Sequence, residues 1–286
     1  MFKKAIIIFF VIMSNFSFLY AAIITVDNKY PSVGQYKTLQ EAHDAAKDGD
    51  SIYVYPSKQS YSGLTISKRL TISGAIGVET STVGSISLTV GSAGSIIDSL
   101  NTGSIHINSK GNTIRNNANT GYIKIYSENQ VFKNNMNCGN IYIYANNQIF
   151  RNNVCGKVYI DADNVVIKQN ITSRMTIDEG HKDNVIVQNE ITYNDKDYYS
   201  LHIYKLNTLV IKNNIIFNSY YIWPNHGDTL KIEDSCNVSI INNVIKPTKY
   251  DANINGSAIT LTPETHAFFV NNIIYPIFTT SIITKV

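Results

Sequence analysis

The sequence is poor in the residues on which several protein classes depend. Its 286 residues include 3 Cys, 6 Pro and 1 Trp, and 16% are charged, against about 25% in an average protein. Three cysteines cannot build a disulfide scaffold, and no Cys/His cluster has zinc-ligand spacing. Lys and Arg number 24 against 21 Asp and Glu, so the basic excess that attracts nucleic acid is missing. We therefore expect no nucleic-acid partner and no resident cofactor.

Long apolar runs are scarce as well. The run at residues 5–13 follows Lys3 and Lys4 and is too short to cross about 30 Å of hydrocarbon. Small residues follow at Ala21 and Ala22, a pattern typical of a secretory signal peptide cleaved near one of them. An uncleaved membrane anchor is the alternative. We expect no membrane span in the mature chain, a secreted, periplasmic or cell-surface location and, from the low-GC composition, a bacterial source.

Asparagine is abundant, with 34 residues, and much of it lies in an internal repeat. Residues 103–117, 121–135, 139–153 and 156–170 each contain an alternating apolar triplet, a polar turn, a second apolar segment and Asn at the end. Later units keep the second half. The last Asn of each unit is Asn117, Asn135, Asn153, Asn170, Asn189, Asn214, Asn243 and Asn272.

These units predict a stacked fold. Two strands of three or four residues cannot close a core alone, so successive units must cover one another. Stacking places each Asn about 4.8 Å from its equivalent, where the side-chain amides can bond in a ladder. The sequence therefore predicts an all-β parallel β-helix of about ten coils with an internal Asn ladder.

The segment at residues 36–74 predicts how the coils begin. Thr38 and Glu41 form a Thr-x-x-Glu capping box, residues 39–47 are helical, and Gly49 ends the helix. This segment resembles the entry into right-handed parallel β-helices of the pectin-lyase-like superfamily. After the signal peptide (1–22), we therefore expect an N-terminal cap (23–62) whose helix covers the first coil, and a β-helix (63–286). Its polygalacturonase and pectate lyase motifs are absent here, so no catalytic residue is transferred.

The apolar triplets also predict an outward face, because residues between inward isoleucines point to solvent. The middle outward column is His106, Lys124, Tyr142, Tyr159, Thr176, His202, Lys231 and Thr260. The column after it is Asn108, Tyr126, Tyr144, Asp161, Asp178, Tyr204, Glu233 and Thr262. The column before it is Ser104, Tyr122, Asn140, Lys157, Arg174, Ser200, Thr229 and Ala258. Tyr rings beside charged groups suit a sugar chain, whereas the alternative is a solvated strand face.

Three late coils carry insertions at residues 192–199, 218–228 and 246–256. Adjacent insertions would form a wall beside the outward face and create a groove, unless they pack on themselves or at an oligomer interface. The predicted substrate-binding residues are Tyr126, Tyr142, Tyr144, Tyr159, Tyr204, Tyr220, Tyr221, Trp223, His226 and Tyr250.

Catalytic chemistry would come from charged residues of the same face. Stacking would place the carboxylates of Asp161 and Asp178 about 5 Å apart, as in a retaining glycosidase or a Ca²⁺ site. The alternative is two solvated acids near Lys157 or Arg174. A lyase, which could use Ca²⁺, needs cations for a uronate and a base for its α-proton. The catalytic candidates are Lys124, Asp161, Arg174, Asp178, His202 and Lys231.

Two structural features remain open. Cys138 and Cys155 precede equivalent glycines, so they stack within disulfide range or remain as paired thiols. The C-terminal residues show no cap, so a folded-back strand, a partner chain or nothing recognisable covers the last coil.

We expect a secreted β-helix protein that binds polysaccharide in the Tyr-rich groove. Whether it also cleaves the chain, as a polysaccharide lyase or a glycoside hydrolase, is left open by the sequence. The alternative function is a non-catalytic surface, adhesion or structural solenoid that binds another protein.

Overall fold

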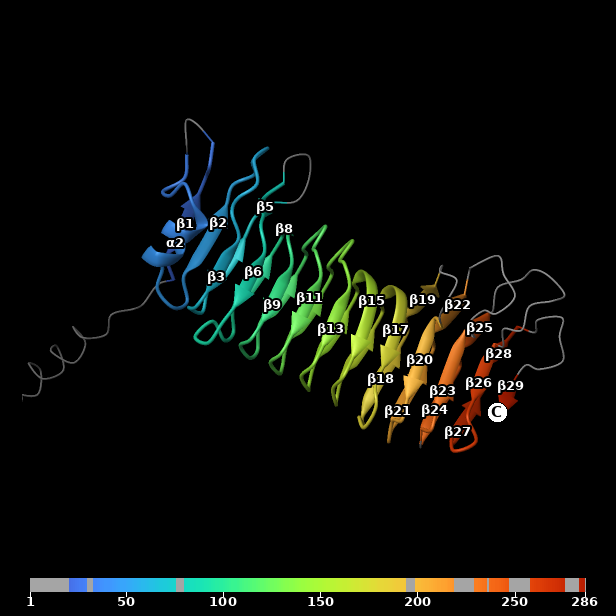
Figure 1. Cartoon of the computed structure of the whole chain (residues 1–286). Helices are drawn as coiled ribbons and strands as arrows, with labels where there is room; N and C mark the ends of the chain where they lie inside the picture. The colour runs from blue at the N-terminus through green and yellow to red at the C-terminus, as the bar shows by residue number, and fades with distance from the viewer. Residues whose placement is uncertain are drawn as a thin grey trace, which may run out of the picture.

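The computed structural model describes residues 21–29, 33–75, 80–193, 199–218, 229–235, 237–246, 258–275 and 283–285. The chain winds coil after coil along one axis, so that the N-terminal and C-terminal coils lie at opposite ends of the molecule (Figure 1). Within these ranges no helix has both the length and the apolar character needed to cross a membrane.

Every strand pair in the described ranges is parallel, and two long sheets run the length of the molecule. The first sheet contains 12 strands: β1 (Ile23–Val26), β2 (Ser51–Val54), β4 (Thr71–Ser73), β7 (Ile96–Asp98), β10 (Thr113–Arg115), β12 (Val131–Lys133), β14 (Ile149–Arg151), β16 (Val166–Lys168), β18 (Asn184–Val187), β21 (Leu209–Lys212), β24 (Val238–Ile241) and β27 (Ala267–Val270). All but the first two follow Leu64, which matches the expected ten coils. The fold is a right-handed parallel β-helix, the hand that parallel crossovers prefer.

The second sheet begins as a single ladder and then divides. Its early strands are β3 (Leu64–Ile66), β6 (Ile86–Leu88), β9 (Ile105–Ile107), β11 (Ile123–Ile125), β13 (Ile141–Ile143), β15 (Val154–Ile160) and β17 (Ile171–Ile177). Two branches then pair with opposite ends of β17. One branch is β19 (Glu190–Tyr193), β22 (Ile215–Asn218), β25 (Val244–Lys246) and β28 (Ile273–Ile274), and the other is β20 (Leu201–Tyr204), β23 (Leu230–Glu233), β26 (Ile259–Leu261) and β29 (Ile283–Lys285). A short ladder of β5 (Thr82–Val83) and β8 (Asn101–Thr102) lies beside the early coils.

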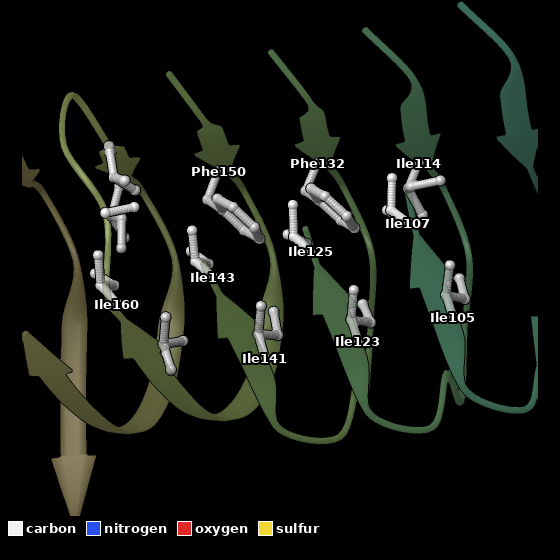
Figure 2. Close-up of a cluster of buried hydrophobic side chains, with 14 of the residues drawn as sticks. Ile105, Ile107, Ile114, Ile123, Ile125, Phe132, Ile141, Ile143, Phe150 and Ile160 are labelled. Carbon is white, nitrogen blue, oxygen red and sulfur yellow. The ribbon is translucent and has the colours of Figure 1, made fainter. Parts of the chain in front are cut away.

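The core consists of columns of identical or similar apolar residues. Ile105, Ile123 and Ile141 are register partners in successive coils, with their side chains fully buried, as Figure 2 shows. Phe132 stacks on Phe150 with ring centroids 4.6 Å apart and planes 2° apart. The predicted inward isoleucines are therefore confirmed, and they bury one continuous apolar interior.

The predicted Asn ladder is confirmed. The Oδ1 atom of Asn153 accepts from the backbone N–H of Asn135 at 3.0 Å and from its Nδ2 at 2.9 Å. The Nδ2 of Asn153 donates in turn to the carbonyl of Phe132 and to Oδ1 of Asn170. The same pattern continues to Asn272 and satisfies polar groups that the turn buries.

The residue before each ladder Asn forms the turn through its backbone conformation. Asn116, Asn134 and Asn152 have φ of 54°, 58° and 56°, a left-handed conformation that Asn tolerates better than most residues. A second amide ladder, which we did not predict, lies at the other turn, where Gln130 and Gln148 accept from buried backbone N–H groups of the preceding coil. Its sequence signal is a Gln before the apolar strand in adjacent units.

The N-terminal cap contains α2 (Leu39–Ala45), and the capping box of Thr38 and Glu41 is present. The helix ends earlier than the expected residues 39–47, since Ala46 is its extended C-cap. The ammonium of Lys68 explains this end, because it donates to the carbonyls of His43, Asp44 and Ala46. Gly49, with φ of 94°, lies in the turn that follows.

The expectation for the third outward column is wrong in the late coils. Ser200, Thr229 and Ala258 are almost completely buried, whereas Tyr122 and Lys157 in the same column of the early coils are exposed. The division of the second sheet explains the difference, because β19 and β20 pair with opposite ends of β17 as two separate strands. Ser200 instead donates to the carbonyl of Phe217 at 3.0 Å.

Cys138 and Cys155 stack as expected, whereas the covering of the C-terminal edge stays open. Cys138 and Cys155 are register partners, and both are free thiols in the structure, so a disulfide between them stays a prediction. β27 ends the first sheet and exposes 64% of Phe268. A partner at this edge likewise stays a prediction.

Candidate functional site

The outward face of the early coils carries a row of tyrosines. We call Tyr122, Tyr126, Tyr142, Tyr144 and Tyr159 the tyrosine strip. Tyr126 and Tyr144 stack with centroids 5.3 Å apart and planes 11° apart, and Tyr144 is 6.2 Å from Tyr159. Tyr126 and Tyr144 remain 49% and 39% exposed, so much of their ring surface is available to a ligand.

Lys124 lies within the tyrosine strip. Its Nζ atom lies 5.5 Å from the centroid of Tyr122 and 6.0 Å from that of Tyr142, which are cation–π distances. The register of β11 and β13 places Lys124 directly beside Tyr142. This part of the face therefore combines aromatic surface with a positive charge.

Asp161 and Asp178 each bond to a different partner. Asp161 is 2.8 Å from Nε2 of His181, whose Nδ1 is 3.1 Å from Asp163. Asp178 accepts a short hydrogen bond from the hydroxyl of Tyr159. Among the described residues no group of three or more His, Cys, Asp and Glu side chains could hold a metal ion. A role for this acid pair in catalysis or Ca²⁺ binding stays a prediction.

A compact group of charged side chains lies on β20 and β23, where the second sheet has divided. We call Tyr199, His202, Lys231 and Glu233 the His202 cluster. The Nε2 atom of His202 is 2.5 Å from Oε2 of Glu233, and Lys231 is 2.6 Å from Oε1. Lys231 also donates to the hydroxyl of Tyr199 at 3.1 Å. The side chains of His202, Lys231 and Glu233 are only 19–21% exposed.

The surroundings set the charge of each member. Burial lowers the pKa of His202, more than the contact with Glu233 raises it, and the charges of Lys231 and Arg174 lower it further. Burial opposes ionisation of Glu233, but hydrogen bonds from Lys231 and His202 still hold its pKa below the usual value. Burial likewise opposes the charge of Lys231, and its bonds to Glu233 and Tyr199 outweigh this and raise its pKa.

This arrangement provides a neutral imidazole beside fixed positive charges. A neutral His202 that donates Nε2–H to Glu233 keeps the lone pair of Nδ1 for accepting a proton. Glu233 orients the ring, as a carboxylate does in other His-based sites. Lys231 remains a cation that can hold an anionic group nearby. His202 can therefore act as a general base on a negatively charged substrate.

The structure brings some predicted site residues together and separates others. His202 and Lys231 are register partners, and the charge of Arg174 acts on His202. Lys124 lies apart from them in the tyrosine strip, several coils earlier. Tyr204 lies beside the cluster, with its ring 6.4 Å from that of His202.

Glu233 and Tyr199 were missing from the predicted set. Glu233 had a signal, because it lies two residues after Lys231 on one strand and therefore on the same face. The contact of Tyr199 with Lys231 had none, since it depends on how the chain returns after an insertion. The predicted wall residues Tyr220, Tyr221, Trp223, His226 and Tyr250 lie outside the described residues, so the groove that they would form stays a prediction.

The parallel stacking of both sheets decides the fold class. The fold is a parallel β-helix. Among solved structures, a variant of the catalytic domain of a GH87 alpha-1,3-glucanase in complex with nigerose is 12% identical over 93% of this chain and 68% of that chain, with a TM-score of 0.43. A pectin methylesterase from Aspergillus niger in deglycosylated form is 13% identical over 93% of this chain and 91% of that chain, with a TM-score of 0.39. No protein-family model and no curated protein matches the chain. These likenesses concern the fold alone and transfer no residue.

Proposed function

We propose that this chain is a secreted protein that binds polysaccharide along the outward face of its second sheet. The observation that carries the proposal is the tyrosine strip, in which exposed rings repeat from coil to coil at about 4.8 Å and Lys124 lies among them. Flat aromatic rings with adjacent polar groups pack against sugar rings. A strand face that contacts only solvent does not require stacked tyrosines.

The test is binding to a polysaccharide array by the mature chain and by two matched double variants. We expect Tyr126→Ala/Tyr144→Ala to weaken binding about tenfold or more, because each substitution removes a ring that provides a large contact area. The control is Tyr53→Ala/Tyr55→Ala, which removes another contacting pair, 5.1 Å apart, outside the tyrosine strip. Equal losses in both variants, or no binding to any glycan, would refute the proposal.

A second, narrower function is favoured by the 2.5 Å contact between His202 and Glu233. We propose that the His202 cluster cleaves an acidic polysaccharide by elimination. His202 removes the proton α to the uronate carboxylate, Lys231 holds that carboxylate, and the electron pair moves to form a C=C bond as the glycosidic C–O bond breaks. A proton from solvent completes the departing hydroxyl.

This function is tested by the absorbance of unsaturated products at 235 nm. We expect His202→Ala and Lys231→Ala to abolish product formation while binding through the tyrosine strip persists. Lys205→Ala is the control, since Lys205 is an exposed cation near the cluster that pairs with Glu179. Binding without product in the wild-type chain would leave a binding protein and reject the elimination.

A further inference from the structure

The first sheet carries a row of basic residues on its solvent face. In β12, β14 and β16 the middle residue is buried, so the third residue points outward, and β21 presents its last residue in the same way. The register places Lys133 beside Arg151 and Arg151 beside Lys168. Lys212 follows beyond Val187. We call Lys133, Arg151, Lys168 and Lys212 the cationic column.

This row lacks the paired carboxylates that several other cations of the chain have. Lys110 pairs with Glu128, Lys205 with Glu179 and Lys231 with Glu233. Arg115, the next member toward the N-terminus, pairs with Asp98. Among the described residues, no carboxylate lies within 4.0 Å of any member of the cationic column. Like charges about 4.8 Å apart repel one another, so the column lowers stability rather than raising it.

A hollowed row of amides borders these cations. Each cation is followed by an exposed Asn or Gln in the left-handed conformation, namely Asn134, Asn152, Gln169 and Asn213. Two depressions lie along this row. One of about 310 Å³ is lined by Gln169, Gln188, Asn213 and one acid, Glu190, and one of about 420 Å³ by Asn116, Asn134 and Met136. Lys133, Lys168 and Lys212 each directly precede a residue that lines one of these hollows, so positive charge lies next to surface that presents amide donors and acceptors.

We propose that the cationic column and its amide hollows bind a linear acidic polysaccharide running parallel to the coil axis. Anionic groups along the polymer would neutralise cations that now repel one another. Sugar hydroxyls would bond to the amides in the hollows. This surface belongs to the first sheet and is separate from the tyrosine strip, so it is independent of the function proposed above.

Nucleic acid fits this surface less well. Sites for single strands use aromatic platforms for base stacking, and the columns on either side of the cations from β12 to β21 contain Val, Ile, Asn and Gln instead. Duplex DNA carries one charge per about 1.7 Å, far denser than one cation per strand spacing. An acidic glycan is the polyanion that these spacings and amides favour.

The test measures the affinity of the full mature chain for polygalacturonate at several salt concentrations. The variant is Lys133→Gln/Arg151→Gln/Lys168→Gln. The matched control, Lys58→Gln/Lys110→Gln/Lys182→Gln, removes the same net charge from exposed lysines elsewhere. We expect the column variant to bind about tenfold more weakly or worse, with a reduced salt dependence, and the control to change less than about twofold.

A fold control is part of the design. The column variant is expected to have a Tm at or above that of the wild-type chain, because mutual repulsion is removed. Tyr126→Ala/Tyr144→Ala should retain the salt-sensitive binding, which separates this surface from the tyrosine strip. Equal losses in the two triple variants would overturn the proposal, as would no binding of polygalacturonate. Tighter binding of a single-stranded oligonucleotide, or of phosphatidylglycerol vesicles, would also overturn it, since the partner would then be of another class.

Discussion

The early and late coils share one interior but differ on the surface. From β9 to β15 the ladder Asn residues lie 17 or 18 positions apart, and the outward face presents exposed, stacked tyrosines. After β17 the spacing grows to 29 positions, the second sheet divides, and the outward face presents a half-buried group of coupled charges. The Asn ladder continues through both regions without a break. Extra residues placed between two strands of a coil therefore change the chemistry of the face while the stacking is preserved.

The largest expected effect concerns the core that both regions share. Phe150→Ala would remove a fully buried ring that stacks on Phe132, and we expect the free energy of unfolding to fall by about 4 kcal/mol. Ile240→Ala is the matched change in the late coils, with an expected loss of about 3 kcal/mol because the side chain is smaller. Chemical denaturation measures both. A loss below about 1 kcal/mol at either position would mean that the cores of the two regions are not equivalent.

The next effect concerns the ladder. Asn153→Ala would leave the buried backbone N–H of Asn135 without its side-chain acceptor and remove one bond to the carbonyl of Phe132, which should cost about 3 kcal/mol. Asn243→Ala removes the equivalent bonds to Asn214 and Ile211 in the late coils, and a similar loss is expected.

Asn152→Gly is the control for both ladder variants. Gly tolerates the φ of 56° at this exposed position, so little change in unfolding free energy is expected. Hydrogen exchange locates the loss within the chain. If Asn243→Ala proves harmless while Asn153→Ala does not, the ladder supports the early coils alone.

The comparison also explains what the sequence could predict. Stacking makes the environment of one coil repeat in the next, so inward isoleucines, the Asn ladder and the order of the outward columns followed from the spacing alone. Ile105, Lys124 and Tyr142 all lie where the repeat predicts. The prediction failed where the repeat itself changes. Ser200 and Thr229 are buried where the second sheet divides into two branches, and no local pattern encodes that division.

The candidate site could likewise be predicted only as far as the repeat determines it. The presence of His202 and Lys231 on one face was predictable, since neighbouring coils share a register. Their coupling through Glu233 requires side-chain geometry, because a carboxylate on the neighbouring column can equally well point to solvent. Asp161 bonds to His181 and Asp178 bonds to Tyr159. These partners come from other columns and turns, so the order of residues within one column could not predict them.

The smallest expected effect tests the coupled charges of the late coils. His202 and Glu233 both have pKa values below those of an unfolded chain, so acid favours unfolding, and the stability they contribute is lost as the pH falls through those values. Glu233→Gln should lower the free energy of unfolding at pH 7 by about 1 kcal/mol, because it replaces a charge-assisted bond with a neutral one. It should also flatten the loss of stability on acidification, since one titrating group is gone.

The titration of His202, followed by NMR, should move to still lower pH, because the carboxylate that favours its protonated form is removed. The control Glu128→Gln, at a partly exposed residue that pairs with Lys110, should leave the titration of His202 unchanged. An unchanged His202 titration in Glu233→Gln would show that the two side chains are not coupled, and the late coils would then resemble the early ones in their electrostatics.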